Sequence, residues 1–119
     1  MRIKIIHNPY SARWNSGKYH QKIIDFFDNL NCDYEISKTK FDGHGIELAK
    51  KATEDGFDII VAAGGDGTIG NVLNGIKSAN HDGEQPVLGL LPLGTANDLA
   101  HNLDNPLALK EACELIITG

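Results

Sequence analysis

Two short glycine-containing segments hold the residues best suited to chemistry in this sequence. GGDGT at residues 64–68 directly follows the apolar run FDIIVAA, and LGTAND at residues 93–98 directly follows the apolar run VLGLLP. Each segment places glycine, threonine and aspartate where a buried strand is expected to turn into a helix. Bare backbone amides at the start of a helix attract anions, so both segments are typical of phosphate binding.

One such segment alone also has an explanation that needs no ligand. A tight strand-to-helix corner with Asp66 or Thr68 as the N-cap would use the same residue types. Two corners of similar design, at the ends of neighbouring parallel strands, would instead lie side by side. Polar groups from both corners could then converge on one ligand, and this favours phosphate binding over a simple turn.

Two familiar phosphate-binding motifs fit less well. The P-loop pattern fails because SGK at residues 16–18 lacks the glycine that the pattern requires at position 12, which is Ala12. Gly65, Gly67 and Gly70 satisfy the dinucleotide pattern GxGxxG, but the next apolar run carries no acidic residue to hold a ribose. An NAD-binding domain is therefore the weaker interpretation. The remaining option is a nucleoside triphosphate site in which glycine amides bind the phosphates and carboxylates coordinate Mg²⁺.

The elements that must position these segments alternate along the chain. Short β-branched or apolar runs predict strands at residues 2–7, 32–39, 57–63 and 86–92. Helical patterns occur at residues 16–31, 46–55, 68–79, 97–103 and 106–118. Strands separated by helices imply right-handed crossovers. The prediction is an α/β fold, a three-layer α/β/α Rossmann-like domain with a mainly parallel sheet over residues 1–119.

Two details of this scheme can be checked directly. The runs at residues 57–63 and 86–92 are apolar without interruption, which predicts strands covered on both faces. The segment FDGHG at residues 41–45 is expected to be a loop before a helix that turns Ile46, Ala49 and Ala52 inward.

Composition excludes several classes of function. The net charge of −5 divides into +3 for residues 1–51 and −8 for residues 52–119, which argues against nucleic acid as a partner. No long apolar segment or signal sequence is evident, so a cytoplasmic location is expected. Cys32 and Cys113 are expected to be reduced, packed thiols. The five histidines lack metal-ligand spacing, and ordinary surface or capping roles are expected for them.

Longer matches add a resemblance to a known family. GGDGTIGNVLNGI and PLGTANDLA, with NPYS near the N-terminus, Thr39, and GHG at residues 43–45, resemble the diacylglycerol kinase catalytic domain family. That family includes bacterial lipid kinases and sphingosine kinases, and its distant relatives are NAD kinases and 6-phosphofructokinases. The resemblance implies transfer of the γ-phosphate of MgATP to the hydroxyl of a lipid such as diacylglycerol.

The resemblance also implies roles for individual residues. Asp66 and Asp98 would be catalytic, holding Mg²⁺ and serving the acceptor hydroxyl. Phosphoryl transfer depends mostly on positioning and charge neutralisation, so a metal ion is expected together with ATP. The residues that would contact the nucleotide are Asn8, Ser11, Thr39, Gly64, Gly65, Asp66, Gly67, Thr68, Gly94, Thr95 and Asn97.

The sequence departs from the family pattern at four positions. Ala12 stands where the pattern NPxSG has glycine, Gly70 and Asn71 replace the last two residues of GGDGTxNE, and His101 replaces an arginine. Asn71 can form hydrogen bonds but carries no charge. These changes keep open a second function, a non-catalytic nucleotide-binding or sensing module on the same fold.

The family implies a partner domain and a lipid surface. Its members continue into a β-rich C-terminal domain that supplies the lipid pocket, and this domain is absent from residues 1–119. Nucleotide binding without efficient turnover is therefore expected of this polypeptide alone. Peripheral contact with a membrane and a homodimer are left open.

Overall fold

Four parallel strands form the centre of the protein. The computed structural model describes residues 2–8, 20–30, 32–80 and 85–92. Within these residues the strand order is β2-β1-β3-β4, and every neighbouring pair is parallel. The elements are β1 (Arg2–His7), α1 (His20–Asn29), β2 (Asp33–Lys38), α2 (His44–Glu54), β3 (Ile59–Gly64), α3 (Asp66–Ser78) and β4 (Val87–Pro92). The predicted α/β alternation and parallel sheet are confirmed; the predicted helices at residues 97–103 and 106–118 lie outside the described residues.

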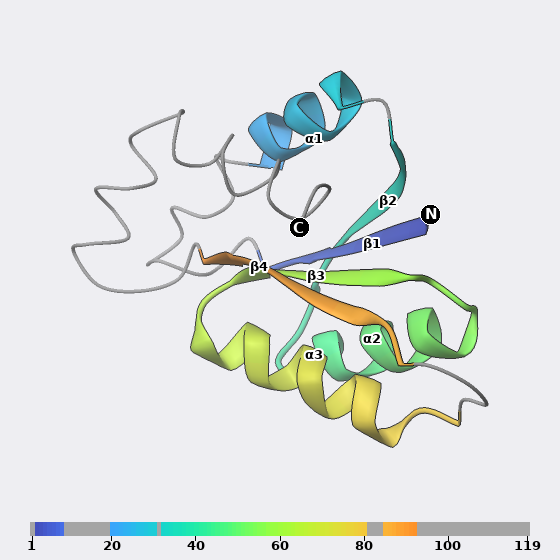
Figure 1. Ribbon diagram of the computed structural model, residues 1–119. Coiled ribbons are helices and arrows are strands. Elements are labelled where there is room, and N and C mark those ends of the chain that lie inside the picture. The colour runs from blue at the N-terminus through green and yellow to red at the C-terminus, as the bar shows by residue number, and fades with distance from the viewer. Residues whose placement is uncertain (1, 9–19, 31, 81–84, 93–119) are drawn as a thin grey trace.

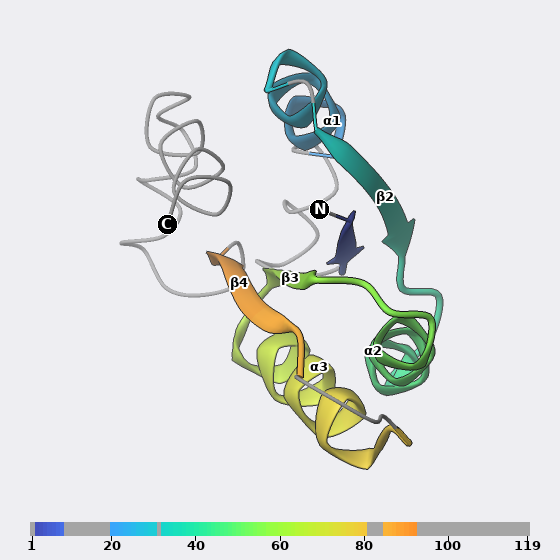
Figure 2. The same cartoon turned by 45° about the vertical axis from the view of Figure 1, so that its right-hand side comes forward.

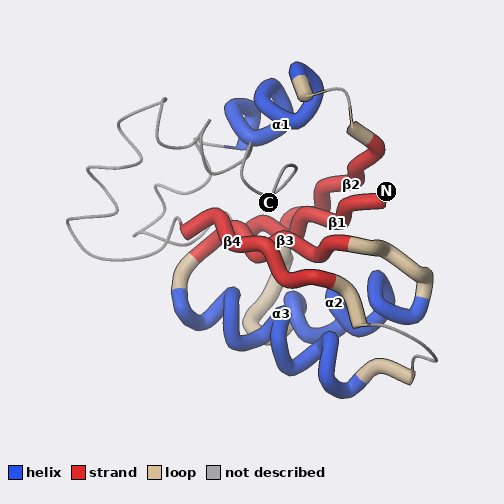
Figure 3. Tube along the Cα trace, viewed as in Figure 1, coloured by secondary structure: helices blue, strands red, loops and turns tan. Residues whose placement is uncertain are grey.

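The helices cover both faces of the sheet. Helix α1 lies on one face, and α2 and α3 lie on the other (Figure 1). In the turned view α2 and α3 run side by side beneath the sheet (Figure 2). The strands form a continuous layer between the helices (Figure 3), so the predicted three-layer arrangement is confirmed.

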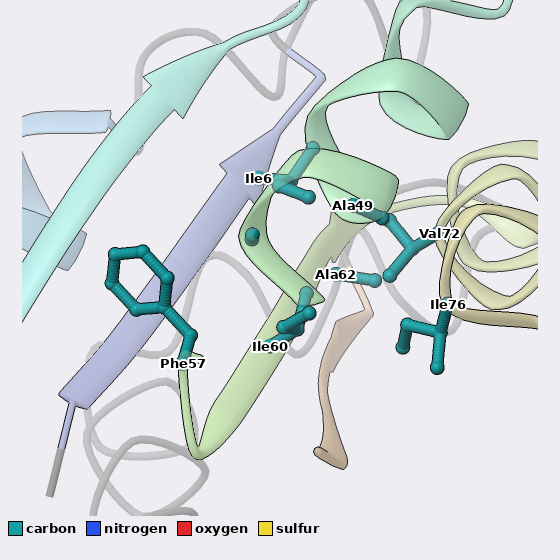
Figure 4. Close-up of a cluster of buried hydrophobic side chains, with 8 residues drawn as sticks. Ile6, Ala49, Phe57, Ile60, Ala62, Val72 and Ile76 are labelled. Carbon is teal, nitrogen blue, oxygen red and sulfur yellow. The ribbon is translucent and has the colours of Figure 1, made fainter. Parts of the chain in front are cut away.

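A separate hydrophobic cluster fills each side of the sheet. Alternate residues of the central strands point to opposite faces, as the pleat of a strand requires. The cluster beneath α1 contains Ile3, Ile5, Ile23, Phe27, Ile59, Val61 and Ala63, and the free thiol Cys32 packs beside it. The cluster on the other face contains Ile6, Ala49, Ala52, Phe57, Ile60, Ala62, Val72 and Ile76 (Figure 4).

The two strands expected to be covered on both faces differ. All six residues of β3 are buried, which confirms that expectation for the central strand. In β4, by contrast, Val87 is 64% exposed and Leu90 is 45% exposed. The prediction for β4 is therefore wrong at these positions, because β4 is the outermost strand of the described sheet and pairs there with β3 alone.

Both helices beside the predicted site begin two residues earlier than predicted. Helix α2 starts at His44 because Gly43 takes the N-cap position with a left-handed φ of 84°. Helix α3 starts at Asp66 because Gly65, in an extended conformation, takes its N-cap position. Asp66 and Gly67 therefore belong to the first turn of α3 rather than to the loop before it.

Close packing against α2 holds α3 in place. A Cβ atom added at Gly75 would meet the carbonyl oxygen of Ile46 and would lie 2.7 Å from the Cβ of Ala49. Only glycine lets the two helices approach this closely at that point. A contact about two turns beyond Thr68 thus fixes the position of the helix that begins within GGDGT.

Candidate functional site

The carboxyl ends of the four strands meet along one edge of the sheet. His7 at the end of β1 pairs with Lys38 of β2 and with Ala63 of β3. Gly64 at the end of β3 pairs with Pro92 at the end of β4. The strands before the two glycine-containing segments are therefore parallel neighbours that end together. This is the edge at which ligands bind in open α/β sheets.

Three residues singled out from the sequence come together at this edge. Asn8 continues β1, and its backbone N–H donates to the carbonyl oxygen of Ala63 over 2.9 Å. The side-chain Nδ2 of Asn8 donates to Thr68 Oγ1 over 3.2 Å. The backbone N–H of Thr39 donates to the carbonyl oxygen of His7 over 2.8 Å. Strand β1 thus anchors both neighbouring segments at its carboxyl end.

A pocket of about 220 Å³ opens beside these residues. It is smaller than the roughly 300–1,000 Å³ of sites that enclose a whole drug-sized ligand, so a ligand of that size would extend beyond it. It is lined by Asn8, Thr39, Phe41, Asp42, Gly43, Gly45, Thr68 and Asn71. The lining joins the end of β1, the β2–α2 loop, the start of α2 and the first two turns of α3.

The N-terminus of α3 supplies the anion-binding character of the site. The first amides of a helix have no partner within the helix and carry a partial positive charge. The N-cap is Gly65, which has no side chain with which to cap them, so the alternative in which Asp66 or Thr68 is the cap is wrong. A Cβ atom at Gly67 would meet nothing within 4 Å, which leaves the backbone open to a ligand on that side.

The remaining predicted site residues fall partly outside the description. The side chain of Asp66 is not described, although its backbone begins α3. Ser11, Gly94, Thr95, Asn97 and Asp98 lie outside the described residues. Among the residues that are described, no group of three or more His, Cys, Asp or Glu side chains could hold a metal ion.

The role of Phe41, an aromatic residue in the loop between β2 and α2, was missed by the sequence analysis. Phe41 is 55% exposed and lines the pocket. Its ring stacks on that of His44, with centroids 4.4 Å apart and an interplanar angle of 19°. The signal that could have found it is an aromatic residue in a polar, glycine-containing loop at the ligand-binding edge.

Two histidines, His7 and His20, contact each other next to the site. His7 is fully buried, so the expected surface or capping role is wrong for this residue. Its Nδ1 lies 2.8 Å from Nδ1 of His20, and the two rings stack. Burial lowers the pKa of His20, and the positive charge of Lys38 lowers that pKa further. The contact between these two histidines links the start of α1 to the end of β1, directly before Asn8.

Comparison with known proteins connects this geometry to a family. The family described as "Diacylglycerol kinase catalytic domain" matches residues 2–119. The chain is 35% identical over 119 residues to a diacylglycerol kinase of Bacillus subtilis strain 168, covering 99% of this chain and 38% of that protein. It is 30% identical over 118 residues to a diacylglycerol kinase of Staphylococcus saprophyticus, with the same two coverages.

A solved structure points to the same family as these two relatives. A crystal structure of a diacylglycerol kinase from Bacillus anthracis strain Sterne matches with a TM-score of 0.73 and 28% sequence identity, covering 97% of this chain and 41% of that one. The chain spans about 38% of the length of the two curated relatives it matches. The match extends over nearly all of the sequence, including both glycine-containing segments. The chain therefore belongs to the diacylglycerol kinase catalytic domain family.

Proposed function

We propose that this domain binds MgATP at the carboxyl edge of its sheet for transfer of the γ-phosphate to a lipid hydroxyl such as that of diacylglycerol. The observation that carries the proposal is the bond between Asn8 and Thr68, which joins the pocket wall to the first turn of α3. One ligand can therefore occupy the pocket and reach the helix N-terminus at the same time. ATP has this form, because it joins a nucleoside to a polyphosphate.

The polyphosphate would lie at the N-terminus of α3. The amides that follow Gly64 and Gly65, the open face of Gly67 and the hydroxyl of Thr68 would receive its oxygens. By family resemblance, Ser11, Gly94, Thr95 and Asn97 would add further contacts. The charge on the phosphates calls for Mg²⁺, which prefers a few carboxylate ligands together with substrate oxygens. We assign that role, and the activation of the acceptor hydroxyl, to Asp66 and Asp98.

The nucleoside would lie toward the pocket. Asn8, Thr39 and Asn71 offer it neutral hydrogen-bonding groups from three different elements. Neutral groups suit a ribose and a base, whose own hydrogen-bonding atoms are uncharged. The carboxylate of Asp42 also lines this pocket and would repel phosphate oxygens there, which favours placing the phosphates at the helix N-terminus instead.

Binding of the lipid acceptor requires a pocket beyond the nucleotide site. We propose that a β-rich C-terminal domain, as in the family, completes the lipid pocket, and that the enzyme works in the cytoplasm against a membrane surface. The helices of the described residues do not include one with the length and apolar character of a membrane span. Association into a homodimer remains a prediction.

A second candidate is a nucleotide-sensing module without catalysis. Asn71 favours it, because this residue lines the pocket and provides an amide where the family pattern has a carboxylate. Such a module would bind MgATP and release it unchanged.

Two experiments separate these functions. Calorimetric titration of the 119-residue chain with MgATP and with NAD should show binding of MgATP at millimolar concentration or below. Binding of NAD but not of MgATP would overturn the kinase assignment. A polypeptide that joins this chain to a β-rich C-terminal domain is then incubated with radiolabelled ATP and lipid extracts. Label in a lipid supports the kinase, whereas MgATP binding with no labelled lipid supports the sensing module.

A further inference from the structure

The most exposed aromatic ring of the described residues stands at the proposed nucleoside subsite. Phe41 is 55% exposed, although phenylalanine is among the residues most often buried. It also lines the pocket that contains Asn8, Thr68 and Asn71. An aromatic ring on the wall of a pocket offers a flat apolar surface to a planar ligand.

The ring of Phe41 is held in place by its own loop. The N–H of His44 donates to the carbonyl oxygen of Phe41 over 3.1 Å, which closes a turn through the left-handed Gly43. The N–H of Lys40 donates to Nδ1 of His44 over 2.9 Å, which fixes the imidazole beneath Phe41. Because His44 is also the first residue of α2, the stacked pair is supported by a helix rather than by a free loop.

We propose that the Phe41 ring, backed by His44, is the surface on which the nucleobase of the phosphoryl donor stacks. The inference rests on the function proposed above and adds a residue that positions the donor. Thr68 belongs both to the pocket and to the first turn of α3. A nucleotide stacked on Phe41 can therefore extend its phosphates toward Gly65 and Gly67.

The chemistry of stacking predicts how the subsite discriminates among ligands. Every nucleobase has a π-face, so an aromatic platform accepts adenine and guanine alike. A polyphosphate without a base gains nothing from the ring. The platform thus selects a nucleotide over bare polyphosphate.

The test compares ligands with and without a base. Dissociation constants for MgATP, MgGTP and magnesium tripolyphosphate are measured by calorimetry on wild-type chain and on Phe41→Ala. The substitution should weaken both nucleotides by about 5- to 150-fold and leave tripolyphosphate unchanged. Phe41→Trp should keep or improve nucleotide affinity. Val87→Ala removes a similarly exposed apolar side chain at the amino end of β4 and should change none of the three affinities.

Other results would overturn the proposal. Nucleotide affinity in Phe41→Ala equal to that of the wild type removes the stacking role and leaves the proposed function standing. An equal loss for tripolyphosphate and nucleotides would show that Phe41 does not act through the base, and would overturn the stacking role. A wild-type chain that binds tripolyphosphate but neither nucleotide removes both proposals. Unchanged nucleotide affinity together with lost binding to diacylglycerol-containing vesicles would assign Phe41 to the lipid acceptor instead.

Discussion

The side-chain amide of Asn8 donates a hydrogen bond to Thr68 Oγ1 over 3.2 Å, although the two residues stand 60 positions apart in the sequence. Asn8 follows β1, the second strand of the sheet order, and Thr68 lies in the first turn of α3. The bond therefore joins the two elements that form the pocket and the helix N-terminus. Both residues also line the pocket, so a ligand bound there would contact both members of this hydrogen bond.

Removing this bond should weaken both the fold and the site. Thr68 as a residue is only 5% exposed, and Asn8→Ala leaves its hydroxyl without that donor. A buried polar group deprived of its partner costs about 1–3 kcal/mol, so urea unfolding should show a loss of this size together with weaker MgATP binding. Thr68→Ser keeps the hydroxyl and serves as the control. Stability and affinity of Asn8→Ala equal to those of the wild type would mean that the bond has no role.

Two glycines of α3 should respond to alanine in opposite directions. Alanine is favoured over glycine inside a helix by about 1 kcal/mol, and nothing lies within 4 Å of a Cβ at Gly70. Gly70→Ala should therefore raise the free energy of unfolding. Gly75→Ala should instead lower it by about 1–3 kcal/mol, because its Cβ would press on the backbone of α2. Chemical denaturation of both variants checks the signs, and stabilisation by Gly75→Ala would contradict the close packing of α2 and α3.

A carboxylate at position 71 should make nucleotide binding depend more on metal. Asn71 lines the pocket as a neutral amide, and Asn71→Glu adds a negative charge beside the proposed ligand. Repulsion of about 1 kcal/mol should weaken metal-free ATP several-fold, and salt should reduce the effect. Saturating Mg²⁺ should recover much of the loss. Asn71→Gln, which adds length without charge, is the control; equal behaviour of the two variants would mean that a charge at position 71 does not act on the phosphates of the bound nucleotide.

The histidine pair should make stability fall in mild acid. Burial, followed by the charge of Lys38, lowers the pKa of His20 below its ordinary value of 6.5. Below that value the unfolded chain binds a proton that the folded chain resists, so the free energy of unfolding decreases as the pH falls toward the lowered pKa. His20→Asn keeps a hydrogen-bonding group but does not titrate. Urea midpoints at about pH 7.5 and 5.5 should differ less in this variant than in the wild type; an equal difference would remove His20 as a cause.

The sequence patterns predict the central strands better than the helix starts and the outer strand. The β-branched run at residues 2–7 gives β1 with its observed limits, and the apolar run before GGDGT gives the fully buried β3. Apolar patterns report burial, and these strands lie at the centre of the core. Helix starts depend instead on the backbone angles of Gly43 and Gly65, which leave no mark on the apolar pattern. A strand's place in the sheet order is likewise a tertiary property, so the exposure of β4 could not be predicted.

The site residues likewise divide into those that the sequence pattern predicts and those that depend on tertiary structure. Asn8, Thr39 and Thr68 could be predicted because each follows a strand or opens a helix at the carboxyl edge of the sheet. Phe41 and Gly75 could not, because their roles depend on what lies opposite them in space. Phe41 stands over His44 and the pocket, and Gly75 faces the backbone of α2.

Backbone amide chemical shifts test the central claim most directly. The ¹⁵N-labelled chain is titrated with MgATP, and the shifts of amides at the two ends of the sheet are compared. The account predicts the largest changes at Gly65, Gly67, Thr68, Asn8 and Thr39, with little change at Asp58 and Val87 at the opposite end. Largest changes at Asp58 and Val87, or saturable binding that leaves the amides of Gly65 and Gly67 unmoved, would contradict it.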